Sequence, residues 1–250
     1  MDGVIYHGNK ILPGVADFIK WLHDEKKEYM FLTNNSGHTP RELQQKLFRM
    51  GLEVTEEHFY TSALATATFL KDQAPGCSVY AIGEAGLFNA LYDAGITMND
   101  VNPDYVVVGE GKAYSLDTLT KAVNLVLGGA KLIGTNTDVS GPIENGIAPA
   151  CGALAAPIEI ATGTKAYFCG KPNPLMMRTG LKLIGCHSAE AVMVGDRMDT
   201  DVISGLESGM STVLVLSGVS TRDTLRTYAY RPSVVLDGVG DIVRMAKGEL

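Results

Sequence analysis

Residues 191–201 read AVMVGDRMDTD, an apolar run followed directly by an acidic turn. The apolar residues before the Gly-Asp pair predict a buried parallel strand that ends in a loop, and the pattern over residues 201–206 predicts a helix after it. The carboxylates therefore lie at the carboxyl end of a strand, where open α/β sheets bind ligands, and clustered oxygens suit Mg²⁺. Helix capping is the alternative. It is favoured for Asp199, whereas for Asp196 this stretch supports capping and metal binding equally.

The composition is that of a globular protein. The 250 residues, 46% hydrophobic and 20% charged, can bury a sizeable core. No apolar run reaches the roughly 18 residues that a membrane span needs, and the N-terminal residues show no secretory pattern. Four cysteines without C-x-x-C spacing suit buried thiols in a reducing compartment, so we expect a cytoplasmic protein. The net charge of -7 argues against nucleic acid as a partner.

Strand-like and helix-like segments alternate along the chain, which predicts an α/β fold with a parallel sheet. Residues 28–32 and 212–216 are two of the predicted strands. The block from residue 76 to residue 167 has a βαβαβ-like pattern of its own, between two joints that contain Gly and Pro. We therefore expect a Rossmann-like core built from residues 1–75 and 168–250, with an inserted α/β domain over residues 76–167.

Polar residues follow strand-like or loop segments at three separated places, and all three are expected at one sheet edge. They are Thr33 with Asn34, Lys171 between a glycine and a proline, and Asp196. A hydroxyl, amide donors, a cation and a metal-binding carboxylate are the groups that hold a phosphoryl group and neutralise its transition-state charge. Each residue also has a structural explanation. Ending a strand is the favoured explanation for Thr33 alone, whereas for Lys171 the structural and functional interpretations are equally supported.

Four short motifs resemble the signature of the haloacid dehalogenase (HAD) superfamily of phosphohydrolases. Residues 2–4 are similar to the second half of D-x-D-G-[TV], residues 32–35 to the second motif, residues 170–172 to the third, and residues 195–201 to the fourth, G-D-x-x-x-T-D. The order of these motifs, and the large insertion between the second and the third, resemble the NagD-type, 4-nitrophenylphosphatase-like branch. That branch carries an α/β cap domain at this insertion, and the resemblance extends along essentially the whole chain.

The resemblance implies a role for each of three aspartates. Asp196 corresponds to the family's Mg²⁺ carboxylate, and Asp201 to the acidic residue that supports the metal site, often through its water shell. Asp2 corresponds to the residue that protonates the leaving group and then activates water, and the backbone carbonyl at that position also binds Mg²⁺. The expected cofactor is therefore Mg²⁺, with Asp2, Asp196 and Asp201 at the metal site.

The same resemblance implies how a phosphoryl group is held. Thr33 and Asn34 correspond to the donors that grip the phosphoryl oxygens, and Lys171 to the lysine that steadies nucleophile and phosphate. In the family the nucleophile is the first aspartate of D-x-D, two residues before the position of Asp2, and this sequence starts one residue before it. The chain as given is therefore expected to be inactive. A truncated sequence is favoured over a natural pseudoenzyme, because losing the central strand would expose its neighbours.

The predicted function is Mg²⁺-dependent hydrolysis of a small phosphomonoester, of the sugar phosphate or nucleoside monophosphate type, through an aspartyl-phosphate. The alternative is a HAD-like protein that binds a phosphorylated metabolite without catalysis. In both cases the partner is a small phosphorylated metabolite, neither nucleic acid nor membrane is expected, and the resemblance leaves a homodimer open. Asn136 and Asp138 are secondary candidates, for which a substrate contact from the inserted domain and turn formation are equally good explanations.

Overall fold

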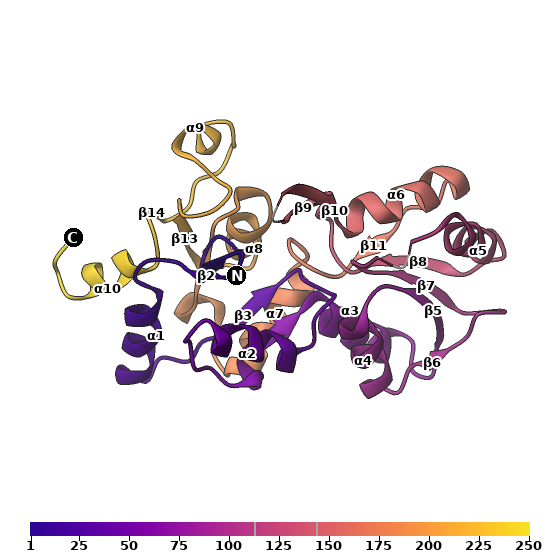
Figure 1. The fold of residues 1–250 in the computed structure, drawn as a ribbon, viewed down its shortest axis with the longest axis horizontal. Helices are drawn as coiled ribbons and strands as arrows, with labels where there is room; N and C mark the ends of the chain where they lie inside the picture. The colour runs from indigo at the N-terminus through magenta and orange to yellow at the C-terminus, as the bar shows by residue number, and fades with distance from the viewer. Residues whose placement is uncertain (113, 144) are drawn as a thin grey trace. The chain divides into compact units, whose positions relative to one another are not determined.

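Helices and strands alternate along the chain (Figure 1) in a computed structural model that describes residues 1–112, 114–143 and 145–250. The two largest sheets are parallel throughout, so the predicted α/β class is confirmed. The chain forms two compact units. Unit 1 comprises Met1–Phe31, Gln44–His58 and Met177–Leu250, and unit 2 comprises Leu32–Leu43 and Phe59–Met176.

Unit 2 contains a five-stranded parallel sheet with the strand order β11-β8-β7-β5-β6. Its strands are β5 (Ser78–Ile82), β6 (Thr97–Met98), β7 (Tyr105–Val108), β8 (Lys131–Gly134) and β11 (Tyr167–Phe168). The central strand β7 reads YVVV and is buried at all four residues, as expected for a strand covered on both faces. In the register, Val108 pairs with both Ile82 and Gly134, so three carboxyl ends are level and the loops after them begin at one edge.

Helices cover both faces of this sheet (Figure 1). On one face α5 (Leu116–Leu127) and α6 (Cys151–Thr162) pack against each other and against β7, and on the other face α3 (Ser62–Gln73) packs with α4 (Ala85–Asp93). Val106 and Val108 belong to one buried cluster with Ala122, Ala155 and Ile158. Alternate residues of β7 therefore face α5 and α6, in keeping with the two-residue period of a strand.

Unit 1 contains a three-stranded parallel sheet of β12 (Val192–Gly195), β13 (Ser211–Val215) and β14 (Val234–Leu236). The first two are the strands predicted at residues 191–194 and 212–216, each displaced by one residue. After β12 the chain passes through the π-helical turn η3 (Met198–Val202) into α8 (Ile203–Glu207). Met198 and Val202 pack with Leu214 in a buried cluster, which anchors the acidic turn at the carboxyl end of β12.

The remaining elements complete the two units. Unit 1 also holds β1 (Tyr6–His7), β2 (Lys10–Ile11), α1 (Val15–Asp24), η1 (Glu56–His58), η2 (Ser188–Glu190), α9 (Arg222–Leu225) and α10 (Gly240–Ala246). Unit 2 also holds β4 (Phe59–Thr61) and the hairpin of β9 (Ser140–Ile143) and β10 (Gly146–Pro149). Three elements include residues of both units, namely β3 (Phe31–Thr33), α2 (Pro40–Arg49) and α7 (Pro174–Ile184). Within the described ranges, no helix has the length and apolar character to traverse a membrane.

Candidate active site

The acidic turn after β12 is closed by Asp201. Its Oδ2 accepts hydrogen bonds from the backbone N–H groups of Asp196 and Arg197, both at 3.1 Å. A Cβ at Gly195 would overlap the Asp201 side chain, so glycine is what leaves room for this contact. Asp196 and Asp201 are each only 5% exposed. The side chain of Asp201 therefore fixes the path of the backbone at Asp196.

Asp199 lies in the first turn of η3, as the capping interpretation expects, and its carboxylate binds the side chain of Arg197. Its carboxylate accepts hydrogen bonds from Nε and Nη2 of Arg197, at 3.0 and 2.8 Å. A guanidinium group matches both oxygens of a carboxylate, and this charge-assisted pair is stronger than a single bond to a backbone N–H. Asp199 is exposed, in contrast to the two buried aspartates of the same turn.

The Asp196 carboxylate lies against two glycines. A Cβ at Gly3 would lie 2.5 Å from Asp196 Oδ2, and a Cβ at Gly218 would overlap the same oxygen. The backbone N–H of Val219 donates a hydrogen bond to this oxygen at 2.8 Å. The carboxylate is therefore held by the loop after β13, and it contacts the N-terminal turn that contains Asp2.

Asp2 lies at the start of that turn and is partly exposed. Its backbone forms a parallel bridge with Tyr6, and its Oδ1 lies 3.3 Å from Nδ1 of His7. Burial, with a smaller contribution from the Asp2 charge, raises the pKa of Tyr6 to about 12. Because Asp2 directly precedes the glycine in contact with Asp196, unit 1 brings the predicted acid/base residue and the predicted metal carboxylates into one region.

The donors in this region are hard oxygens, as Mg²⁺ requires. They are the carboxylates of Asp196 and Asp201 and the backbone carbonyl of Asp2. Among the residues that the structure describes, no three His, Cys, Asp or Glu side chains converge as they would in a site built from side chains alone. Mg²⁺ commonly binds through one or two carboxylates, with water and substrate phosphate completing its shell, so this donor set fits it.

Asn34 and Lys171 are joined within unit 2 although they lie 137 positions apart. Asn34 Oδ1 accepts a hydrogen bond from the Lys171 N–H at 2.8 Å, and Asn34 Nδ2 donates to the Lys171 carbonyl at 3.0 Å. Lys171 Nζ donates to the Leu32 carbonyl at 3.0 Å and is buried. A Cβ at Gly170 would lie 2.7 Å from Asn34 Oδ1, so glycine permits this close approach.

The side chain of Thr33 is buried, and its Oγ1 accepts a hydrogen bond from the backbone N–H of Asn35.

A second layer of polar side chains surrounds Asn34, and sequence reasoning missed its arrangement. Asn34 Nδ2 also donates to Asp138 Oδ2 at 2.9 Å, and Asn136 Nδ2 donates to the same oxygen at 2.9 Å and to Glu110 Oε1 at 3.3 Å. Burial raises the pKa of Glu110 to about 7. The signal available in the sequence was position, because Glu110 follows β7 and Asn136 and Asp138 follow β8, at the same sheet edge.

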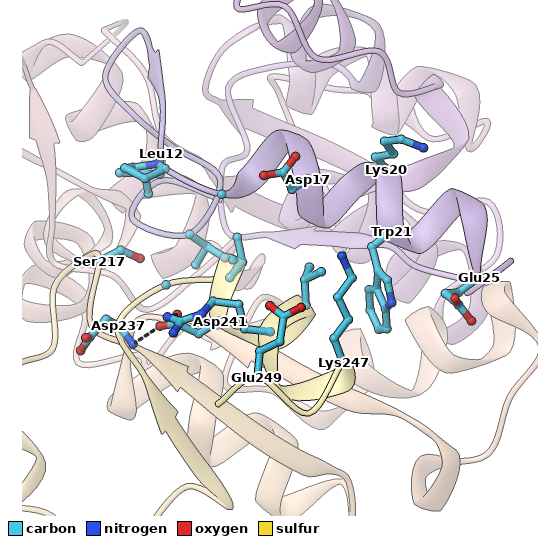
Figure 2. A pocket seen from close by; sticks show the side chains of 18 of the residues that line it. Leu12, Asp17, Lys20, Trp21, Glu25, Ser217, Asp237, Asp241, Lys247 and Glu249 are labelled. Atoms are coloured by element: carbon cyan, nitrogen blue, oxygen red, sulfur yellow. Dashed lines mark hydrogen bonds and ion pairs between the residues drawn. The ribbon is translucent and has the colours of Figure 1, made fainter.

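Unit 1 also contains a cavity of about 870 Å³ beside α1 and α10 (Figure 2). Trp21 of α1 and Val243 of α10 line it, together with charged groups of both signs such as Lys20 and Asp241. Val4 and Ser217 also line it, and the Ser217 hydroxyl donates to the carbonyl of Gly3 near the candidate site. The three predicted metal residues are not among those that line it, so the cavity is separate from the site.

Comparison with known proteins identifies the family. Family models match the two ends of the chain, a haloacid dehalogenase-like hydrolase model over residues 1–97 and a HAD-hydrolase-like model over residues 168–242. Over 242 residues the chain is 50% identical to dihydroxyacetone phosphatase of Corynebacterium glutamicum, which covers 97% of this chain and 88% of that protein. The chain belongs to the haloacid dehalogenase-like hydrolases. Ribonucleotide monophosphatase NagD of Escherichia coli is 42% identical to this hydrolase, over 97% of the chain and 95% of its own.

Solved structures agree with this assignment. The structure of 4-nitrophenylphosphatase from Thermotoga maritima matches with a TM-score of 0.94 and 32% identity, over 98% of this hydrolase and 94% of that chain. NagD of Escherichia coli matches with a TM-score of 0.91 over 96% of this chain and 95% of its own. The predicted resemblance to the HAD superfamily and its NagD-type branch is therefore confirmed, as is the fold class, and these named relatives are phosphatases.

Proposed function

We propose that this HAD-like hydrolase is a Mg²⁺-dependent phosphatase that hydrolyses small phosphomonoesters through an aspartyl-phosphate. The observation that carries the proposal is the pairing of Asn34 with Lys171. It places a buried ammonium group beside the loop that contains the Thr33 hydroxyl, and a fixed cation next to donors is what a transferring phosphoryl group requires. The phosphatase activity named for the relatives supports the same reaction class.

Each candidate site residue has its own role in the proposed reaction. Asp196, Asp201 and the backbone carbonyl of Asp2 would hold Mg²⁺, which supplies positive charge to the phosphoryl oxygens when bound. Asp2 protonates the departing alcohol oxygen and then takes a proton from the water that releases inorganic phosphate. The Thr33 hydroxyl, the backbone N–H groups at Asn34 and the Lys171 ammonium hold the phosphoryl oxygens during both steps.

The proposed nucleophile is the first aspartate of the family's D-x-D motif. The family motif places it two residues before Asp2, so we propose the full reaction for a chain extended upstream with that aspartate. Phosphorus gains a bond to its carboxylate oxygen as the ester oxygen leaves, and water then breaks the new bond.

The substrate is proposed to be a small phosphorylated metabolite of the sugar phosphate or nucleoside monophosphate type. The names of the relatives point to this range, since they include a dihydroxyacetone phosphatase, a ribonucleotide monophosphatase and acid sugar phosphatases. We propose that residues 76–167 act as the α/β cap that selects among such substrates, on a core of residues 1–75 and 168–250. A cytoplasmic location and a small phosphorylated metabolite as partner complete the proposal.

Hydrolysis of 4-nitrophenyl phosphate by the upstream-extended chain, with and without Mg²⁺, tests the function. Asp196→Asn should lower the Mg²⁺-stimulated rate at least about a hundredfold, because it removes a charged ligand from the transition-state environment. Asp199→Asn is the matched control. It removes an exposed carboxylate from the same turn, and the rate should stay within about twofold because exposed ion pairs contribute little.

Two results would overturn the proposal. The first is an extended chain that shows no metal-stimulated turnover of any phosphomonoester. If that chain also binds inorganic phosphate in a calorimetric titration, the alternative of a non-catalytic phosphate-binding protein takes its place. The second is equal loss of rate in Asp196→Asn and Asp199→Asn, which would remove the distinction between the buried carboxylate and the exposed one.

A further inference from the structure

The side-chain amide of Asn34 has a defined orientation in unit 2. Its Oδ1 accepts from the Lys171 N–H, and its Nδ2 donates both to the Lys171 carbonyl and to Asp138 Oδ2. If the amide were flipped, two donors would face each other at the Lys171 N–H, and two acceptors would face each other at Asp138. The Lys171 backbone requires this orientation, and Asp138 Oδ2 reinforces it by accepting from the same Nδ2.

Asp138 is itself held in place. Asn136 is fully buried, and its Nδ2 donates to Asp138 Oδ2 at 2.9 Å, while its Oδ1 accepts from the Thr135 hydroxyl at 2.9 Å. The Asp138 carbonyl accepts the N–H of Gly152 in the first turn of α6, at 2.9 Å. The carboxylate is therefore fixed by a buried side chain and by a helix, so it can restrain Asn34.

We propose that Asp138 is a positioning residue for Lys171 and that it acts through the amide of Asn34. The contacts form a short chain from the loop after β8, through Asn34, to both backbone groups of Lys171. The consequence for catalysis rests on the proposed function, in which Lys171 holds the phosphoryl group. A misplacement of about 1 Å in such a group can cost a hundredfold in rate. The structural role of Asp138 is independent of the reaction.

Hydrogen exchange at the Lys171 backbone amide tests the structural role in the 250-residue chain, because Asn34 Oδ1 is the acceptor for that N–H. Measured by NMR, exchange in Asp138→Asn should be about tenfold faster than in the wild type, as expected when a charge-assisted hydrogen bond is lost. Asp104→Asn is the matched control. Asp104 accepts hydrogen bonds from Ser78 in the same unit, so its loss should leave exchange at Lys171 within about twofold.

A double-mutant cycle tests whether Asp138 acts on Lys171 through the amide of Asn34. In the Asn34→Ala background, where the amide is absent, Asp138→Asn should produce no further acceleration of exchange at Lys171. Unchanged exchange in the single variant Asp138→Asn, or the same acceleration in both backgrounds, would overturn the proposal. If Asp138→Asn loses its far-UV circular dichroism, Asp138→Ser repeats both measurements with a small polar residue that cannot reach the two amides.

The kinetic consequence is measured in the upstream-extended chain. Asp138→Asn should lower kcat for 4-nitrophenyl phosphate about tenfold and change KM by less than about twofold, because the substrate still binds but the cation is misplaced. Full kcat in an active enzyme would overturn the catalytic part of the proposal. If the wild type shows no turnover, the proposed function fails instead, while the exchange measurements still decide whether Asp138 positions Lys171.

Discussion

Glu110 is a carboxyl group whose ionisation is opposed by the fold of unit 2. Burial raises its pKa from 4.5 to about 7, with an opposing contribution from the hydrogen bond of Asn136 and a further rise from the Asp138 charge. Tyr114 and Cys151 also face Glu110, and burial raises the pKa of each, that of Cys151 to about 11. Both are therefore neutral between pH 5 and pH 8, so Asp138 is the charged neighbour that matters in this range.

A pKa that is higher in the folded state than in the unfolded state means that the folded protein binds the proton more tightly. Stability from this group is complete below pH 4.5 and is lost as the pH rises to about 7. At 1.36 kcal/mol for each pKa unit, the rise from 4.5 to about 7 corresponds to about 3 kcal/mol. Glu110→Gln removes the ionisation while keeping the shape of the side chain. It should stabilise unit 2 by about 3 kcal/mol at pH 8 and by about 1 kcal/mol or less at pH 5.

Hydrogen exchange at the amides of β7 measures the opening free energy of unit 2 at each pH, because β7 is the central strand of its sheet. Trp21 is the single tryptophan and belongs to unit 1, so its fluorescence during urea unfolding serves as the control and should not distinguish the variant. A gain in Glu110→Gln of the same size at pH 5 and pH 8 would refute the reasoning. A carboxyl-carbon NMR titration of Glu110 with a midpoint at the ordinary pKa of 4.5 would do the same.

Two further substitutions probe the metal region and the core. Gly218→Ala places a Cβ on the Asp196 carboxylate, so the Mg²⁺ affinity of the extended chain, measured by calorimetric titration, should fall at least about tenfold. Gly238→Ala is the control, because a Cβ there meets nothing within 4 Å, and it should retain the Mg²⁺ affinity. Leu132→Ala removes a side chain that is 3% exposed, and urea unfolding should show a loss of about 2 to 5 kcal/mol. Leu127→Ala is the control, because that side chain is 63% exposed, and it should change stability by less than about 0.5 kcal/mol.

The sequence predicts strands well where burial alone decides them. The strands predicted at residues 191–194 and 212–216 differ from β12 and β13 by one residue, because each contains buried apolar residues such as Met193 and Leu214. The strand predicted at residues 28–32 is less accurate, since β3 begins only at Phe31. The carbonyl of Tyr29 accepts a hydrogen bond from the ring of His58 at 3.0 Å. This is a tertiary contact that the local sequence pattern does not predict.

For the candidate site, position along the chain predicts which strand ends carry polar groups but not which groups touch. The expectation that Asn34 and Lys171 come together is met by direct hydrogen bonds within unit 2. The role of Asp138 could not be predicted, because it depends on the neighbour order of strands that are distant in the sequence. For Asp199, the sequence did not predict the side-chain partner. Its spacing suits a cap, but the nearby guanidinium of Arg197 is the stronger partner.

The glycines before Asp196 and Lys171 have a structural role that the sequence alone does not reveal. From the sequence, these two glycines indicate only tight turns. In the structure, a Cβ at Gly195 would overlap Asp201, and a Cβ at Gly170 would lie 2.7 Å from Asn34 Oδ1. Each glycine therefore leaves the space for a side chain that holds the following functional residue, which is Asp196 in one motif and Lys171 in the other. In these two motifs the glycine before the charged residue makes room for a polar side chain packed against the backbone, and the structure supplies the identity of that side chain.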